Sequence, residues 1–149
     1  MQDREKKLYG CGALIINESH QVLLQLRSKY SRNDIGMWSQ PGGAIESIDQ
    51  DVTEDIIKTN IYREVKEELG IEINIIDYLA TTIHSDNHYR WTAYSYLAKI
   101  VSGTPQILEP KKHTKIRWIN IEDLPDNLNQ VTRASVEAYL KKIYLIRRL

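Results

Sequence analysis

Three glutamates, Glu64, Glu67 and Glu68, crowd one turn near the end of a predicted helix that stops at Gly70. Carboxylates on neighbouring helical positions repel one another. At the negative end of the helix dipole each costs roughly 0.3–1 kcal/mol. A divalent cation removes this cost, and hard cations such as Mg²⁺ take oxygen ligands of this kind. The three residues are therefore candidate metal ligands.

A helical wheel separates the three glutamates. At about 100° per residue, the apolar stripe spans roughly 0° to 120° and consists of Ile57, Ile61, Val65 and Leu69. Glu64 and Glu68 fall near −20° and 20°, at the edge of this stripe, and Glu67 falls near −80°. The alternative is a solvated, salt-bridged helix face, since Arg63 and Glu67 are four residues apart.

A glycine pair precedes this helix. Gly42 and Gly43 follow Pro41, and Glu46 adds a further carboxylate. Glycine lets the backbone approach a ligand or metal closely. An ordinary tight turn is the alternative interpretation of a glycine pair.

Together these residues resemble the Nudix hydrolase family, whose box reads G-x5-E-x7-R-E-U-x-E-E-x-G-U, with U a bulky aliphatic residue. Residues 63–71, REVKEELGI, match the second half at every defined position. The first half departs from the pattern: the glutamate position is Asp49 counted from Gly43, but Asp55 counted back from Arg63. The chain thus carries six extra residues between the glycines and the helix.

The resemblance extends beyond the box to members similar to MutT. Residues 23–27 and 36–43 look like the segment ahead of the box, and Glu109-Pro110, Trp118 and Leu124-Pro125 look like the closing segment. The resemblance implies hydrolysis of a nucleoside diphosphate linked to another group. This reaction would depend on Mg²⁺, with Mn²⁺ as a substitute. A (deoxy)nucleoside triphosphate, including the oxidised 8-oxo-dGTP type, would give NMP and pyrophosphate. The alternatives are an ADP-ribose or nucleotide-sugar pyrophosphatase and a non-catalytic nucleotide-binding module.

The resemblance also implies roles for individual residues. Glu64, Glu67 and Glu68, with the backbone carbonyl of Gly43, would hold the metal, and Arg63 would orient the glutamates.

The general base would be Glu67 or Glu109. Related sequences carry a further glutamate two residues after the latter, where this chain has Lys111. Arg27 would contact a substrate phosphate; an exposed arginine at a strand end is the alternative.

The remaining pattern predicts elements that position these residues. Strands are expected over 8–17, 21–27, 71–83, 89–101 and 115–120. Helices are expected from a cap at Asp51 to Leu69 and over 130–147, with one helical turn over 121–124. Strands on both sides of an internal helix indicate an α/β fold with a mixed sheet between helices. The resemblance makes this a Nudix-type α/β/α sandwich in a single domain, residues 1–149.

Composition narrows the function classes. Lys plus Arg and Asp plus Glu both number 20 in 149 residues, which argues against a broad grip on duplex nucleic acid. No run reaches 18 apolar residues, so no membrane span is expected, and cytoplasm is the default location. The single cysteine, Cys11, is expected to be a buried thiol. The sequence does not decide between a monomer and a homodimer.

Two further features of the sequence are a pair of histidines and a group of aromatic residues. A zinc site at His84 and His88 is disfavoured because no cysteine lies close in sequence to complete it. Trp38, Tyr89 and Trp91 could stack on a base, but their strand-like positions favour core packing.

Overall fold

The computed structural model describes residues 6–45, 51–85 and 89–148. Its elements, in chain order, are β1 (Lys6–Ile15), β2 (Gln21–Arg27), β3 (Trp38–Ser39), β4 (Gly42–Ala44), α1 (Glu54–Leu69), β5 (Glu72–Ser85), β6 (Tyr89–Ser102), β7 (His113–Asn120) and α2 (Gln130–Arg148). The five predicted strands and two predicted long helices are confirmed, with ends that shift by up to three residues.

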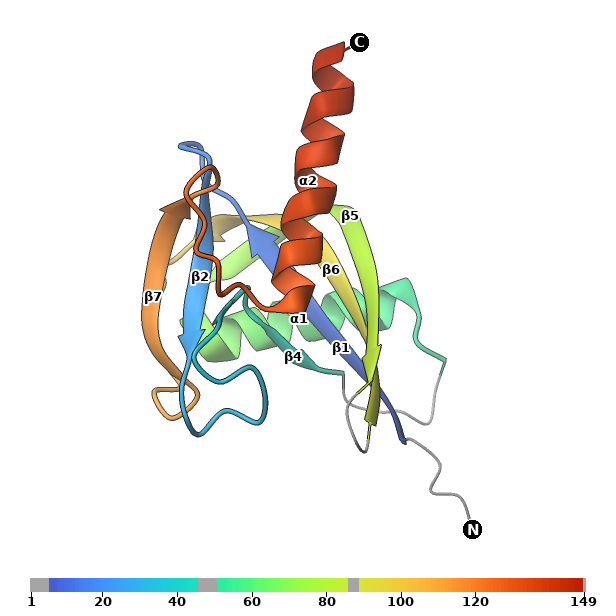
Figure 1. The fold of residues 1–149 in the computed structure, drawn as a ribbon, viewed down its shortest axis with the longest axis vertical. Helices are drawn as coiled ribbons and strands as arrows, with labels where there is room; N and C mark the ends of the chain where they lie inside the picture. The colour runs from blue at the N-terminus through green and yellow to red at the C-terminus, as the bar shows by residue number, and fades with distance from the viewer. Residues whose placement is uncertain (1–5, 46–50, 86–88, 149) are drawn as a thin grey trace.

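The strands form two sheets (Figure 1). The larger has the order β4-β1-β6-β5 and is mixed, because β1 runs parallel to β6 whereas the other pairs are antiparallel. The smaller sheet, β3-β2-β7, is wholly antiparallel. The predicted α/β fold with a mixed sheet is confirmed. The second sheet forms a separate part of this fold.

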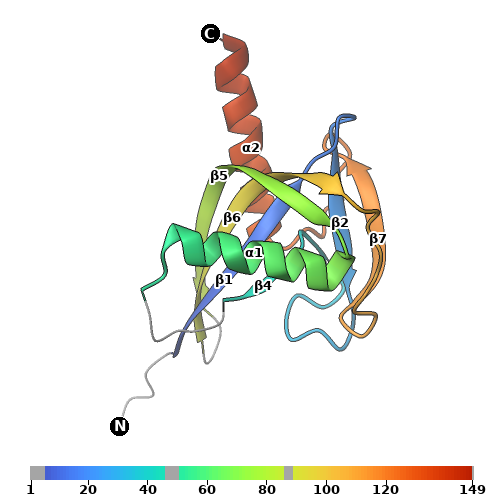
Figure 2. The same cartoon turned by 180° about the vertical axis from the view of Figure 1, so that it is seen from behind.

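The two long helices cover opposite faces of the larger sheet. In Figure 1 helix α2 lies in front of this sheet, and Figure 2, seen from behind, shows α1 across its other face. Alternate β1 residues follow this division: Ala13 and Ile15 pack in the cluster with α1, and Leu14 packs with Val136 of α2. Cys11 is buried, as expected.

Helix α1 begins two residues later than predicted. Its N-cap is Thr53, whose side chain accepts a hydrogen bond from the Ile56 amide at 3.3 Å, so the prediction of a cap at Asp51 is wrong. A hydroxyl can satisfy a free amide of the first turn just as a carboxylate can. The helix ends where predicted, since Gly70 adopts a left-handed φ of 70°.

Two further predictions near the C-terminus are corrected. Residues 121–124 form a hydrogen-bonded turn rather than a helical turn, closed by the Asp123 amide on the Asn120 carbonyl. In α2, Val136 is buried but Leu140, placed on the same apolar face by its spacing, is 45% exposed. The helix extends past the sheet at this point (Figure 1), so its later turns have less to pack against. Among the described residues, no helix is long and apolar enough to cross a membrane.

Candidate active site

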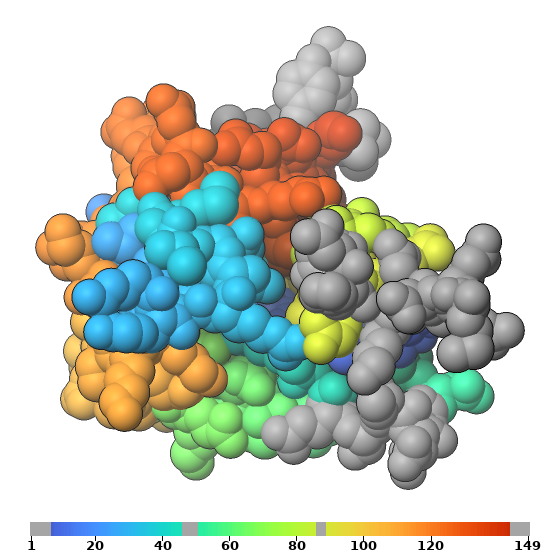
Figure 3. Space-filling view, turned by 60° about the horizontal axis from the view of Figure 1, so that its bottom comes forward, coloured from blue at the N-terminus to red at the C-terminus, as the bar shows by residue number. Residues whose placement is uncertain are grey.

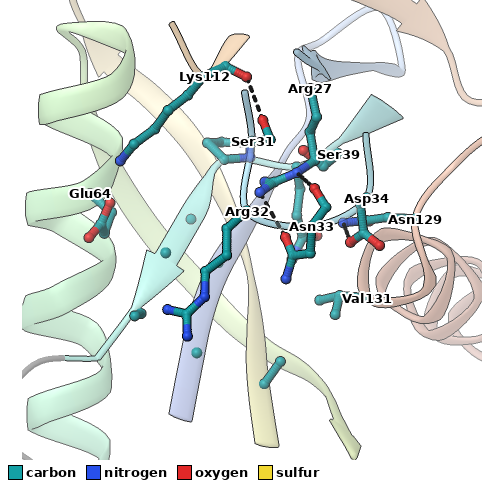
Figure 4. A pocket seen from close by; sticks show the side chains of 18 of the residues that line it. Arg27, Ser31, Arg32, Asn33, Asp34, Ser39, Glu64, Lys112, Asn129 and Val131 are labelled. Atoms are coloured by element: carbon teal, nitrogen blue, oxygen red, sulfur yellow. Dashed lines mark hydrogen bonds between the residues drawn. The ribbon is translucent and has the colours of Figure 1, made fainter. Parts of the chain in front are cut away.

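A pocket of about 500 Å³ lies where the two sheets and α1 meet. Its walls include the glycine-rich parts of β1 and β4, helix α1, and the segment between β2 and β3. Figure 3 views this end of the molecule, where residues 28–36, in light blue, lie against the orange segment that leads into β7. Figure 4 shows the side chains that line the pocket, with Glu64 of α1 on one side and Asn129 and Val131 on another.

Two of the three box glutamates face this pocket. Glu68 is only 3% exposed, and its Oε2 has no hydrogen-bond partner among the described residues. Burial raises the pKa of Glu68 well above its ordinary value, and the charges of Glu64 and Glu109 raise it further. The side chain of Glu64 is 12% exposed, and burial likewise raises its pKa. The wheel therefore placed both residues correctly, at the edge of the buried face.

Strand β4 brings the backbone of Gly43 directly against Glu64. A Cβ atom at Gly43 would lie 2.5 Å from the Glu64 Cδ atom and 2.6 Å from its Oε2. A side chain at this position would require the Glu64 carboxylate to move, so glycine lets the strand lie against the carboxylate where it stands. The glycine pair is thus part of the pocket wall as well as a turn.

Arg63 joins the inner and outer glutamates. Its Nη1 lies 3.0 Å from Glu64 Oε1 and 3.2 Å from Glu67 Oε2, and its Nη2 donates to Asn60 Oδ1 at 2.8 Å. The side chain of Glu67 is 53% exposed and does not line the pocket. The arrangement matches the orienting role that the resemblance implied for Arg63.

The acidic residues fit a hard divalent cation. Glu68 carries a buried oxygen that has no hydrogen-bond partner among the described residues, and the Glu64 carboxylate lies against the backbone of Gly43. A buried carboxylate without a partner is costly unless a cation or proton compensates it. Within the described part of the chain, no three Asp, Glu, His or Cys side chains are gathered closely enough to hold a metal as they stand. Glu67 would have to turn from Arg63 to join the other two.

Arg27 lines the pocket, but loop contacts engage two of its nitrogens. Its Nε donates to the Asn33 carbonyl at 2.9 Å and its Nη2 to Asn33 Oδ1 at 2.8 Å. Burial lowers its pKa. The alternative of a merely exposed strand-end arginine does not describe this position.

Glu109 lies on the segment between β6 and β7, next to the acidic wall. Lys112 Nζ is 3.0 Å from Glu109 Oε2, and the Leu108 amide bonds the Glu68 carbonyl at 3.1 Å. Glu109 is therefore near the box glutamates, although it is not among the residues that line the pocket.

Comparison with known proteins decides the family. The NUDIX domain model matches residues 6–139. This chain belongs to the Nudix family.

Its relatives agree on the fold and the reaction class. It is 32% identical to a MutT NUDIX hydrolase from Burkholderia pseudomallei, with a TM-score of 0.78, over 90% of this chain and 98% of that one. An ADP-ribose pyrophosphatase from Streptococcus suis 89-1591 is 25% identical, with a TM-score of 0.61, over 89% and 91% of the two chains. The curated "Putative nudix hydrolase 1" of Caenorhabditis elegans is 26% identical over 127 residues. The matched region covers 83% of this chain and about a third (32%) of that relative. The chain is a Nudix hydrolase with the α/β/α sandwich of the family.

Of the departures in the first half of the Nudix box, the structure describes Asp55. Asp55 is exposed in the first turn of α1 and lines no part of the pocket. Asp49 and Glu46 lie outside the described residues. What remains of the Nudix site in the described residues is its second half, on α1, together with Gly43.

The aromatic residues divide between core and pocket. Trp38 packs in the core cluster beneath α2, whereas Trp91 lines the pocket, stacked on His84 with ring centroids 6.5 Å apart. The Arg32 guanidinium lies 4.9 Å from the centroid of the Tyr89 ring and 5.5 Å from that of Trp91. Core packing was thus the wrong expectation for Trp91.

Sequence reasoning missed several residues of the pocket wall, among them Lys112, His113 and Asn129. The proximity of Lys112 and His113 to Glu109 in the chain was the one available signal, because the closing segment was already singled out.

Proposed function

We propose that this Nudix hydrolase converts a (deoxy)nucleoside triphosphate, oxidised purine nucleotides included, into NMP and pyrophosphate with Mg²⁺. The observation that carries the proposal is one pocket lined both by two carboxylates, the half-buried Glu64 and the buried Glu68, and by an aromatic residue, Trp91. The first suits a metal that neutralises phosphates, and the second suits a nucleobase. The likeness to a MutT NUDIX hydrolase supports the triphosphate as substrate.

Glu64, Glu68 and Glu67, with the Gly43 carbonyl, would hold the cation. When bound, Mg²⁺ supplies Lewis acidity, orients the phosphates and lowers the pKa of water. Arg63 keeps Glu64 and Glu67 in place by pairing with both carboxylates, which is the support that metal-binding carboxylates need from their surroundings.

The reaction needs a base for the attacking water. The water oxygen forms a bond to phosphorus, the bridging P–O bond breaks, and pyrophosphate leaves while the water proton passes to a carboxylate. We assign this proton to Glu67, whose side chain is 53% exposed. In this step Glu64, Glu68 and the Gly43 carbonyl would be the groups that keep the cation. Glu109, whose Oε2 lies 3.0 Å from Lys112 Nζ, is the second candidate.

A second candidate substrate is ADP-ribose, favoured by the likeness to the Streptococcus suis ADP-ribose pyrophosphatase. The acidic wall serves both reactions, because each breaks a pyrophosphate link. The products differ: a triphosphate yields NMP and pyrophosphate, whereas ADP-ribose or a sugar nucleotide yields NMP and a sugar phosphate.

The test is product identification by chromatography after incubation with Mg²⁺ and a panel of triphosphates, 8-oxo-dGTP, ADP-ribose and sugar nucleotides. We expect NMP and pyrophosphate from one or a few triphosphates. Turnover of the sugar conjugates alone would move the function to the second candidate. No turnover of any of these compounds, with Mg²⁺ or Mn²⁺, would contradict both.

A further inference from the structure

Positively charged and nitrogen-bearing side chains gather on the pocket wall that the smaller sheet provides. Arg27 ends β2, and its Cα partner across the antiparallel pair is His113, the first residue of β7. Directly cross-strand residues share a face of a sheet. Both residues, together with Lys112, line the pocket.

Hydrogen bonds fix this wall to the segment after β2. The Ser28 amide and the Ser31 hydroxyl both donate to the Lys112 carbonyl at 2.8 Å, and the Ser28 hydroxyl donates to the Lys111 carbonyl. Figure 4 shows the bond from Ser31. These three hydrogen bonds hold the backbone carbonyls of Lys111 and Lys112 in one place, so the wall is set before any ligand binds.

His113 is a buried side chain with one ring nitrogen unsatisfied among the described residues. It is 3% exposed, and its Nδ1 has no hydrogen-bond partner among the described residues. Burial, with Arg27 and Lys112 nearby, lowers its pKa to about 4, and Glu109 opposes this shift. The ring is therefore neutral at pH 7, and one of its nitrogens lacks the hydrogen bond that buried polar atoms normally make.

Lys112 places a flexible, positively charged side chain on this wall. Its Nζ pairs with Glu109 at 3.0 Å while its side chain stays 60% exposed. In Figure 4 the side chain extends across the pocket toward Glu64 on α1. A flexible ammonium between the two walls can reach a phosphate that lies against the acidic one.

We propose that Lys112 and His113, with Arg27, form a subsite for the terminal phosphate of the substrate's polyphosphate chain. Two cations and a neutral imidazole match the charge and the three free oxygens of a terminal phosphoryl group, which sugar nucleotides lack. Trp91, on the other sheet, would then contact the nucleoside end of the substrate. The inference rests on the proposed function for its claim that the phosphate belongs to a nucleotide.

Inorganic pyrophosphate is the probe, added to the folded protein with Mg²⁺ and followed by NMR of the histidine rings and by calorimetry. The ring signals of His113, assigned with His113→Asn, should shift, and its pKa should rise by about one unit or more as an anion binds beside it. Lys112→Gln should weaken pyrophosphate binding by about tenfold, the size of a charged hydrogen bond. The neighbouring Lys111→Gln is the matched control and should leave the affinity unchanged.

Kinetics give a second readout. Lys112→Gln should raise KM for a triphosphate. If the protein also hydrolyses ADP-ribose, the same substitution should leave KM for ADP-ribose unchanged.

Unmoved His113 signals, or equal affinities of Lys112→Gln and Lys111→Gln, would overturn the subsite while leaving triphosphate hydrolysis intact. Conversely, pyrophosphate bound through Lys112 in a protein that hydrolyses no nucleotide would support the subsite and contradict the proposed function.

Discussion

Glu67 differs from the other two box glutamates in its surroundings. Its side chain is 53% exposed and pairs with Arg63, whereas Glu68 is 3% exposed. We therefore expect Glu67→Gln to lower kcat by about 10²–10⁴-fold, the range for a lost general base. Its free energy of unfolding should change by less than about 1 kcal/mol, because exposed ion pairs contribute little. Steady-state kinetics and urea unfolding measure the two effects.

Glu72→Gln is the control, since Glu72 is another exposed glutamate in an ion pair, 3.4 Å from Lys66. It should leave both kcat and stability nearly unchanged. A Glu67→Gln enzyme with normal kcat would move the base to Glu109.

His113 gives a prediction about pH. Its pKa is about 4 in the folded chain and roughly 6.5 when unfolded. Between these values the unfolded chain binds the extra proton, so this residue makes the protein less stable as pH falls from 6.5 to 4. Relative to His113→Asn, which cannot titrate, the wild type should lose up to about 3 kcal/mol over this window. Urea unfolding in phosphate-free buffer measures the difference; parallel curves would contradict the burial of a neutral ring.

At the scale of single residues, the sequence predicted the pocket residues of α1 and missed those that β7 and the segment before it bring to the opposite wall. The wheel placed Glu64 and Glu68 toward the interior because helical geometry alone sets those angles. Lys112 and His113 reach the pocket through the pairing of β7 with β2 and through bonds to Ser28 and Ser31. No periodicity in a single sequence records such tertiary contacts.

Helix α1 offers a test of how its first turn is held. The Thr53 hydroxyl caps the helix by accepting from the Ile56 amide. Thr53→Ala should therefore lower the free energy of unfolding by about 1 kcal/mol, the usual loss for a removed cap. Asp51→Ala is the matched control, two residues earlier and exposed, and should cost almost nothing. A larger loss for Asp51→Ala than for Thr53→Ala would restore the cap that the sequence suggested.

The long elements were predictable because they carry hydrophobic periodicity over many residues. Strands β3 and β4 have two and three residues, too few to show any period. Yet β4 places Gly43 against Glu64, and β3 extends the second sheet. The division into two sheets depends on these short strands and on the pairing of β2 with β7, which local patterns do not specify.

Across the whole molecule, the site lies at a junction that no single element forms. Acidic groups come from α1, the glycine wall from β1 and β4, the aromatic ring from β6, and Arg27 and His113 from the second sheet. The zero net charge therefore conceals a separation within the pocket, with carboxylates on one wall and cations on another. We expect such a separation to place a metal and a phosphate side by side, as the proposed hydrolysis requires.

The global stability of the protein should consequently depend on a divalent cation. Glu64 and Glu68 are buried with raised pKa values, so leaving them charged without a cation costs free energy at neutral pH. Mg²⁺ at about a hundred times its dissociation constant should raise the free energy of unfolding by roughly 2.7 kcal/mol, by mass action alone. Thermal unfolding at pH 7.5, with EDTA and then with Mg²⁺, measures this gain. Glu68→Gln should be at least as stable as the wild type in EDTA, since it removes a buried charge, and should lose most of the gain with Mg²⁺. Equal Mg²⁺ stabilisation of both proteins would place the cation elsewhere than at the glutamates of α1.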